Sequence, residues 1–208
     1  MRAEVKAFVA SCKCQTANPA NPTPPQKIKP LPQGPWRITA VDYKGPIGTG
    51  RNQVYLHKQM DAYSRYPVVH LLRSTKLTEL KKALGNTIRT HGRPDEIWSD
   101  GGPTYNAHEW PRWVHRWGCK AKKTTPKHPP ANGMVERFNR NLKLVIHAAY
   151  ATGRDLEEEV EKYVAAYRST PHAVTGQTPN KLIFNREVQT KLPGIPQTPQ
   201  APHHKEAR

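Results

Sequence analysis

Residues 36–43 read "WRITAVDY", and they alternate between apolar and polar side chains as a half-buried β-strand does. Trp36, Ile38 and Ala40 fall on one face, and Asp42 ends that same face. A carboxylate at the end of an apolar face needs a partner, because burial removes its water. This stretch therefore predicts one wall of the core and marks Asp42 as a candidate functional residue.

The pieces that follow "WRITAVDY" predict a mixed sheet. "NQVYLHKQM" (52–60) and "YPVVHLL" (66–72) look like strands, and the turn-like "DAYSR" between them suggests an antiparallel meander. Helix and strand patterns then alternate over 75–92 (helix), 94–100 (strand), 106–118 (helix) and 119–125 (short strand). Strands first, then helices between single strands, predict an α/β domain whose mixed sheet is flanked by helices.

Helical spacing makes two further predictions about the core. In "NAHEWPRWVHRWG" (106–118), Asn106 and Glu109 have the spacing of a capping box, and the three tryptophans share one helical face and are expected in the core. A long helix over about 134–151 is expected to face inward with Val135, Phe138, Leu142, Val145 and Ala149. Two shorter helices follow, in "DLEEEVEKYVAAYR" (155–168) and after the cap Thr178.

The charge of the chain points to a polyanionic partner. Lys and Arg number 33 against 16 Asp and Glu, which gives a net charge of +17. Nucleic acid is the first candidate and an anionic membrane face the second. A solubilising surface is the alternative, although evenly mixed charges would serve it better.

Several classes of protein are disfavoured. No apolar run reaches the roughly 18 residues of a transmembrane helix, and the N-terminus lacks the apolar segment of a signal peptide. Three cysteines do not form a disulfide framework, which suits a reducing compartment. We expect a chain that is not secreted and, with DNA as partner, a nuclear location after passage through the cytoplasm.

Proline marks the borders of the folded part. The stretches 18–35 and 192–208 are proline-rich and are interpreted as extended linkers or tails. The predicted organisation is an N-terminal segment (1–15), a linker (16–35), a folded domain (36–186) and a Pro- and His-rich basic tail (187–208).

Three acids occupy comparable places along the chain. Asp42 and Asp100 are expected at strand ends, and Glu136 in the first turn of the long helix. Strand ends and helix N-termini meet at one edge of an α/β sheet, where three carboxylates could hold Mg²⁺. Taken singly, Asp100 could simply start a turn, and Glu136 could simply interact with the positive end of the helix dipole. Asp61 and Asp95 are interpreted as ordinary turn residues.

Several motifs resemble those of one family. "VDYKGPI" (41–47), "IWSDGGP" (97–103) and "HPPANGMVERFNR" (128–140) resemble the three catalytic blocks of retroviral and gypsy-class LTR retrotransposon integrases. The 35 residues between Asp100 and Glu136 are the interval characteristic of that family. "DAYSRYP" and "YRSTPHAVTGQTPNKLIFNR" (167–186) resemble further segments of it. The resemblance implies a ribonuclease H-like, five-stranded mixed sheet in an integrase catalytic core.

The resemblance also implies a chemistry and its residues. The family cleaves DNA and transfers strands as a polynucleotidyl transferase that uses two Mg²⁺ or Mn²⁺ ions. The implied metal ligands are Asp42, Asp100 and Glu136. The family binds the DNA end with polar and basic residues of this helix, so the resemblance implies that role for Asn139, Arg140 and Lys143, which helical spacing places on the face of Glu136; a solvated surface face is the alternative. Weaker candidates in the preceding loop are Lys127, His128 and Asn132. The implied partners are DNA, as element ends and target duplex, and further copies of the chain, with no membrane and no small-molecule substrate.

The chain departs from the family at its N-terminus. "FVASCKCQ" (8–15) resembles the end of the family's zinc-binding module, but Cys12 and Cys14 are spaced C-x-C and no histidine pair precedes them. A structural zinc site needs four ligands. We therefore expect no zinc, and interpret residues 1–15 as a metal-free helix that remains from such a module.

Two other functions stay open. A catalytically quiet, host-captured DNA-binding or scaffold protein could keep the same fold. A ribonuclease H acting on RNA–DNA hybrids is a further possibility, although the 35-residue interval favours an integrase.

Overall fold

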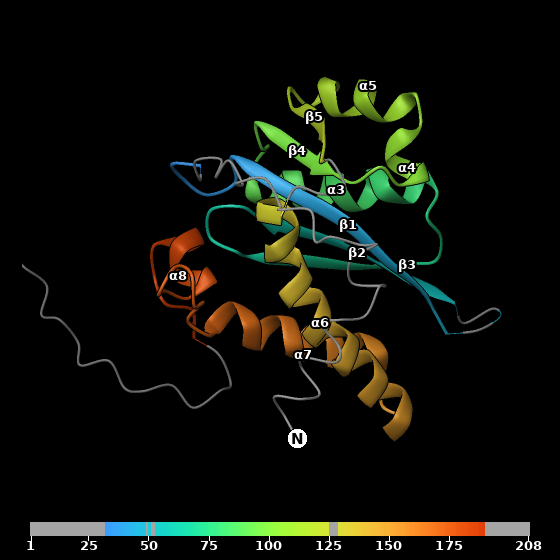
Figure 1. The fold of residues 1–208 in the computed structure, drawn as a ribbon, viewed down its shortest axis with the longest axis vertical. Coiled ribbons are helices and arrows are strands. Elements are labelled where there is room, and N and C mark those ends of the chain that lie inside the picture. The colour runs from blue at the N-terminus through green and yellow to red at the C-terminus, as the bar shows by residue number, and fades with distance from the viewer. Residues whose placement is uncertain (1–31, 49, 51–52, 125–128, 190–208) are drawn as a thin grey trace, which may run out of the picture.

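The computed structural model describes residues 32–48, 50, 53–124 and 129–189, and the side chains of 129–137 are not described. The predictions for residues 1–15, for most of the linker and for nearly all of the C-terminal tail lie outside the described residues. Cys12 and Cys14 lie outside them too. The folded domain predicted over 36–186 is described apart from short gaps (Figure 1).

A five-stranded mixed sheet forms the centre of the domain, in the order β3-β2-β1-β4-β5. Its strands are β1 (Ile38–Ile47), β2 (Val54–Asp61), β3 (Pro67–Leu72), β4 (Glu96–Ser99) and β5 (Lys120–Lys123). β1, β2 and β3 pair antiparallel, and β4 pairs parallel with both β1 and β5. The predicted meander and mixed sheet are both confirmed.

Helices cover both faces of the sheet (Figure 1). One group is α3 (Leu77–His91), α4 (Pro103–Asn106) and α5 (Glu109–Arg116), and the other is α6 (Pro129–Thr152), α7 (Leu156–Ser169) and α8 (Pro179–Phe184). In the described ranges, no helix has both the length and the apolar character needed to cross a membrane.

Each face of the sheet has its own apolar core. The first contains Trp110, Trp113 and Val114 of α5, and the half-buried Trp117 packs against it. The prediction that the three tryptophans lie in the core is confirmed. The second core is built around Phe138, Leu142 and Ile146 of α6, which meet β2 and α7. Ala149 is buried as predicted, whereas Val145 is only half-buried.

The predicted capping box is wrong. Asn106 ends the short helix α4, and its side-chain amide donates to the carbonyl of Gly101. α5 begins separately at Glu109, without a side-chain cap. Pro103 explains the difference, because proline is favoured in a first helical turn and here begins a helix of its own.

The long helix begins earlier than the sequence suggested. α6 begins at Pro129 rather than near Met134, since a first helical turn accepts prolines, which have no N–H to leave unpaired. Glu136 therefore lies beyond the first turn, and Asn132 lies in the helix rather than in a loop. α6 ends near Gly153, whose φ of 65° lies in the left-handed region that favours glycine.

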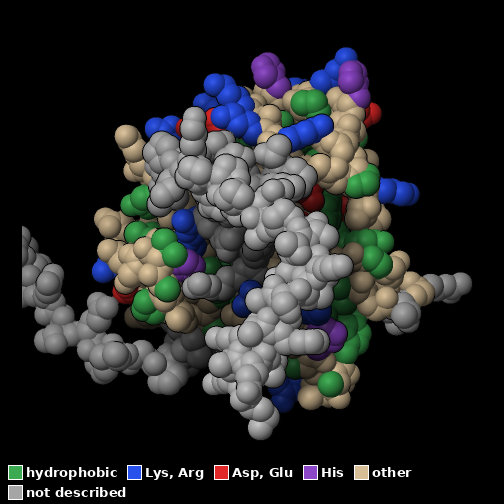
Figure 2. Space-filling view, in the orientation of Figure 1, with side chains coloured by type: hydrophobic (Ala, Val, Ile, Leu, Met, Phe, Trp, Pro, Cys, Tyr) green, Lys and Arg blue, Asp and Glu red, His purple; other side chains and the backbone are tan. Residues whose placement is uncertain are grey.

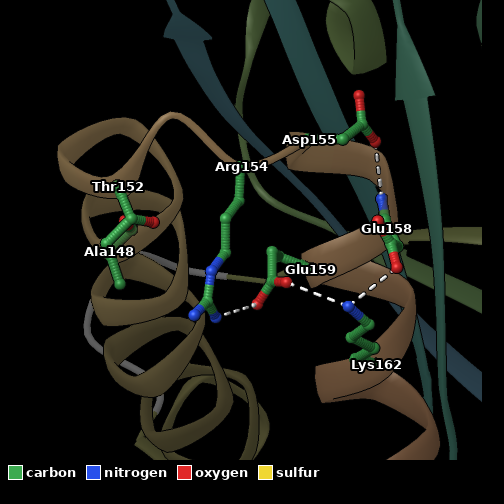
Figure 3. A network of polar contacts seen from close by, with 7 residues as sticks. All are labelled: Ala148, Thr152, Arg154, Asp155, Glu158, Glu159 and Lys162. Carbon is green, nitrogen blue, oxygen red and sulfur yellow. Dashed lines mark hydrogen bonds and ion pairs between the residues drawn. The ribbon is translucent and has the colours of Figure 1, made fainter.

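Charged side chains join the end of α6 to α7 (Figure 3). Asp155 caps α7 by accepting a hydrogen bond from the Glu158 amide at 2.8 Å, and Arg154 pairs with Glu159 at 3.8 Å. Lys162 pairs with both Glu158 and Glu159. Glu159 is largely covered, with 18% of its side chain exposed.

Asp61 is an anchor of the fold rather than an ordinary turn residue. It is fully buried at the end of β2 and accepts hydrogen bonds from the Trp36 amide (2.9 Å), the Ser64 amide (2.8 Å) and the Ser64 hydroxyl (2.6 Å). Burial raises the pKa of Asp61. The hydrogen bonds act in the opposite direction but are the smaller effect. Asp95, by contrast, is a surface residue paired with Arg37.

Replacing Phe138 by alanine should destabilise the domain by about 3–5 kcal/mol, because the ring is buried and packs against Tyr163 and Tyr167. Leu144 lies on the same helix and is 65% exposed, so Leu144→Ala should change stability by less than about 0.5 kcal/mol. Urea unfolding of both variants measures the difference, and equal losses would contradict the assignment of Phe138 to the core.

Asp61→Ala should cost at least about 2 kcal/mol, because it leaves buried donors on Trp36 and Ser64 without an acceptor. Asp95→Ala breaks one exposed ion pair and should cost about 1 kcal/mol or less. Thermal melts of the two variants provide the comparison. A melting point for Asp61→Ala as high as that of Asp95→Ala would refute the anchoring role.

Candidate active site

The two aspartates lie side by side where β4 ends. Val41 of β1 is in register with Ser99 of β4, so Asp42 and Asp100 are the next residues along two neighbouring parallel strands. Such strands lie about 4.8 Å apart. The sequence predicted that Asp42 ends a strand. This prediction is wrong, because β1 stays paired with β2 as far as Ile47. The two aspartates therefore meet where the shorter strand, β4, ends.

Asp42 is held by a lysine and an amide from two other elements. The Lys58 ammonium on β2 donates to Asp42 Oδ2 at 2.5 Å, and Asn139 Nδ2 on α6 donates to the same oxygen at 3.2 Å. Lys58 also donates to Asn139 Oδ1 at 2.5 Å. β1, β2 and α6 thus converge on one carboxylate.

Lys58 is almost inaccessible to water. Only 3% of its side chain is exposed, against 29% for Asp42. Burial lowers the pKa of Lys58, and the neighbouring Asp42, together with the more distant charge of Asp100, acts in the opposite direction. Both aspartates therefore act on this ammonium. The sequence analysis missed Lys58, although a lysine in the middle of the strand "VYLHKQMD" was a usable signal.

Asp100 follows β4 and is exposed. Its Oδ1 accepts a hydrogen bond from the Gly102 amide at 3.0 Å, so Asp100 does start the tight turn. A Cβ on Gly102 would come within 3.0 Å of that oxygen, and glycine therefore permits the close approach. The turn fixes the position of the carboxylate beside Asp42.

Aromatic rings line the opposite side of the sheet behind the aspartates. Tyr43 packs against His57 and Tyr105, with ring centroids 5.1 and 5.7 Å apart. Burial raises the pKa of Tyr105, and the charges of Tyr43, Asp42 and Asp100 add to the effect. Burial and the neighbouring His70 and Lys58 lower the pKa of His57, which keeps this ring neutral. The layer is a region of low polarity, in which charges interact more strongly than in water.

The helix α6 brings the remaining predicted residues toward this edge. Asn139, predicted to grip DNA, lies half-buried against Asp42 and Lys58. Glu136 precedes Asn139 by one helical turn, on the same helical face. The side chains of Glu136 and Asn132 are among those not described, and Lys127 and His128 lie outside the described residues. Arg140 and Lys143 are exposed on α6.

The two aspartates suit a divalent cation in donor type and position, because Mg²⁺ prefers carboxylate oxygens. Among the side chains that the structure describes, no three His, Cys, Asp or Glu groups converge on a possible metal position. The predicted third ligand, Glu136, is outside that set, so the convergence of three carboxylates stays a prediction. One oxygen of Asp42 is already shared by Lys58 and Asn139.

Several proteins of known sequence are similar to this chain. The sequence profile of the integrase core domain family matches residues 32–129. An uncharacterized protein of Caenorhabditis elegans is 29% identical over 191 residues, which is 91% of this chain and 15% of that protein. The Pro-Pol polyprotein of feline foamy virus is 26% identical over 198 residues, 93% of this chain and 17% of the polyprotein. The chain thus spans less than a fifth of the length of these relatives.

Solved structures share the fold. A chain of the simian T-cell lymphotropic virus intasome, in complex with a PP2A regulatory subunit, superposes with a TM-score of 0.69 at 19% identity, covering 97% of this chain and 72% of that chain. The HTLV-2 integrase catalytic core in complex with magnesium gives a TM-score of 0.60 at 19% identity, covering 73% and 98%. Residues 32–129 thus resemble the integrase core domain family in sequence, and the mixed five-stranded sheet shares the ribonuclease H-like fold of integrase catalytic cores.

Proposed function

We propose that the chain is a DNA-binding polynucleotidyl transferase that cleaves DNA and transfers strands in a metal-dependent reaction of DNA integration. The observation that carries this proposal is the placement of Asp42 and Asp100 on neighbouring parallel strands, with α6 docked onto Asp42 through Asn139. The integrase core family supports this class of reaction. A relative of the same fold is described in complex with magnesium, which supports the choice of cation.

Asp42, Asp100 and Glu136 are the proposed ligands of two Mg²⁺ or Mn²⁺ ions. When bound, such ions activate the attacking oxygen and stabilise the leaving oxygen of an in-line displacement at phosphorus. Asp42 lies on β1 and Asp100 directly follows β4, so the pairing of these two strands holds the two residues next to each other. Glu136 would close the site from α6, whose position depends on the hydrogen bond from Asn139 to Asp42.

Basic side chains offer a path for the DNA backbone. Lys and Arg gather at the top of the view in Figure 2, where α5 and β5 lie. The exposed cations of these two elements are Arg112, Arg116, Lys120, Lys122 and Lys123. The residue after β5, Thr124, donates through its amide to the Ser99 carbonyl at 2.8 Å, so the end of β5 lies beside the residue that precedes Asp100. Phosphates bound there and by Arg140 and Lys143 would pass close to the aspartates.

The proposed partners are DNA, as element ends and target duplex, and other copies of the chain. Assembly is supported by relatives of the same fold, namely an intasome and an integrase core solved in trimeric and dimeric forms. The proposed place of action is the nucleus, where target DNA lies.

A catalytically quiet DNA-binding protein is the second candidate function, and one observation favours it. Lys58 already neutralises Asp42 at 2.5 Å, so the fold gathers this carboxylate without requiring a metal ion. The two candidates differ in strand joining and agree in DNA binding.

Asp100→Asn should reduce strand joining at least about 100-fold, because it removes one charged metal ligand. The asparagine oxygen can still accept the hydrogen bond from Gly102, so the fold and DNA binding should survive. A strand-transfer assay on a short duplex with Mn²⁺, paired with a binding assay at moderate salt, measures both effects. Asp95→Asn is the control, and undiminished joining by Asp100→Asn would exclude the proposed site.

Lys143→Ala should weaken binding to all DNA sequences alike and reduce the slope of log affinity against log salt by about 0.9, as expected for one lost phosphate contact. Lys162→Ala is a matched control, because it removes the same charge from a lysine engaged with Glu158 and Glu159. Fluorescence anisotropy at several salt concentrations gives the slope. A slope that Lys143→Ala leaves at the wild-type value would remove Lys143 from the DNA path.

A further inference from the structure

Lys58 is a buried cation that already serves a proposed metal ligand. Its ammonium contacts Asp42 Oδ2 and Asn139 Oδ1, each at 2.5 Å, and only 3% of the side chain is exposed. Asn139 completes a closed triangle by donating to the same Asp42 oxygen. An internal positive charge thus lies at the edge where the proposed function requires a divalent cation.

The ammonium has little freedom to leave. Lys58 belongs to β2, which is hydrogen-bonded to β1 on one side and β3 on the other, and its cross-strand neighbours are Asp42 and Val69. On the same face of β2, Leu56 and Met60 are buried. Moving the ammonium away from Asp42 would leave a buried charge without the carboxylate that it pairs with, which is strongly unfavourable.

A divalent cation at Asp42 would meet this charge at close range. Mg²⁺ binds carboxylate oxygen at about 2.1 Å, so an ion on Oδ2 would lie within about 5 Å of the Lys58 nitrogen. Two like charges at this range repel, and the half-buried setting weakens screening by solvent. The two cations therefore oppose each other at Asp42.

We propose that Lys58 competes with divalent metal for Asp42, so that the free protein keeps the ammonium there and binds metal at Asp42 only weakly. This inference rests on the proposed function, because it takes Asp42 as a metal ligand. Lys58 acts as a positioning residue. By holding Asp42 and Asn139, it sets the concentration of divalent metal that the site needs for binding. Metal would gain access to Asp42 when the triangle opens.

Lys58→Met and Lys58→Gln test the competition through Mn²⁺ affinity, measured from the electron paramagnetic resonance signal of free Mn²⁺. Both variants should bind Mn²⁺ at least about tenfold more tightly than wild type, because a like charge has been removed from the site. Adding Asp42→Asn to Lys58→Met should abolish the gain. Lys162→Met, which deletes an equal charge paired with two carboxylates of α7 (Figure 3), should bind Mn²⁺ as wild type does.

The wild-type protein provides a test that needs no change at Lys58. If the ammonium excludes metal from Asp42, wild type and Asp42→Asn should bind Mn²⁺ with affinities within about threefold. Wild type that binds Mn²⁺ tenfold more tightly than Asp42→Asn would overturn the proposal, as would unchanged affinity in both Lys58 variants. The readout also separates the two proposals. Tighter Mn²⁺ binding by the Lys58 variants, with no strand joining by wild type, would support the competition and contradict the proposed function. Strand joining by wild type, with no tighter Mn²⁺ binding by the Lys58 variants, would support the proposed function and contradict the competition.

Discussion

The contact between Asp42, Lys58 and Asn139 is the constraint on which the candidate site depends. It joins a central strand, its antiparallel neighbour and the long helix α6 through the buried ammonium of Lys58, the 29% exposed carboxylate of Asp42 and the half-buried amide of Asn139. A buried charge without a partner of opposite sign is unfavourable, so each of the three residues constrains where the other two can lie. The same contact fixes where α6, and Glu136 one turn earlier, can lie relative to the sheet. The place of the α6 backbone relative to the sheet thus depends on an ion pair between two strands.

The rest of the fold supports this contact from both sides. One core packs α3 and α5 against β1 and β4, which holds the strands that carry or precede the two aspartates. The other packs Phe138 and Leu142 of α6 against Leu56 of β2 and against α7, which presses the helix onto the sheet. Asp61 closes the β2–β3 turn and binds the amide of Trp36 just before β1. Site and scaffold share residues on the same strands, so changes in one affect the other.

Periodicity in the sequence was sufficient for the strands, the large helices and the tryptophan face, because these patterns depend on which residues leave water. Thr178 was likewise identified as a cap, and its hydroxyl accepts from the Lys181 amide. Boundaries were harder. The prolines at 129 and 130 were interpreted as loop, yet α6 begins with them, and the capping spacing of Asn106 and Glu109 spans two separate helices. Local spacing cannot show these outcomes, since tertiary packing decides between a loop and a first helical turn. Lys58 was missed because its partner lies 16 residues away and only strand register brings the two together.

The two outer strands of the sheet have a consequence for how copies of the chain can meet. β5 carries lysine at three of its four positions, and on the other border the guanidinium of Arg168 donates two hydrogen bonds to the carbonyl of Pro67 in β3. Charge on one border and a capped carbonyl on the other both disfavour the addition of a foreign strand. Both features would disfavour edge-to-edge pairing of sheets between copies of this chain.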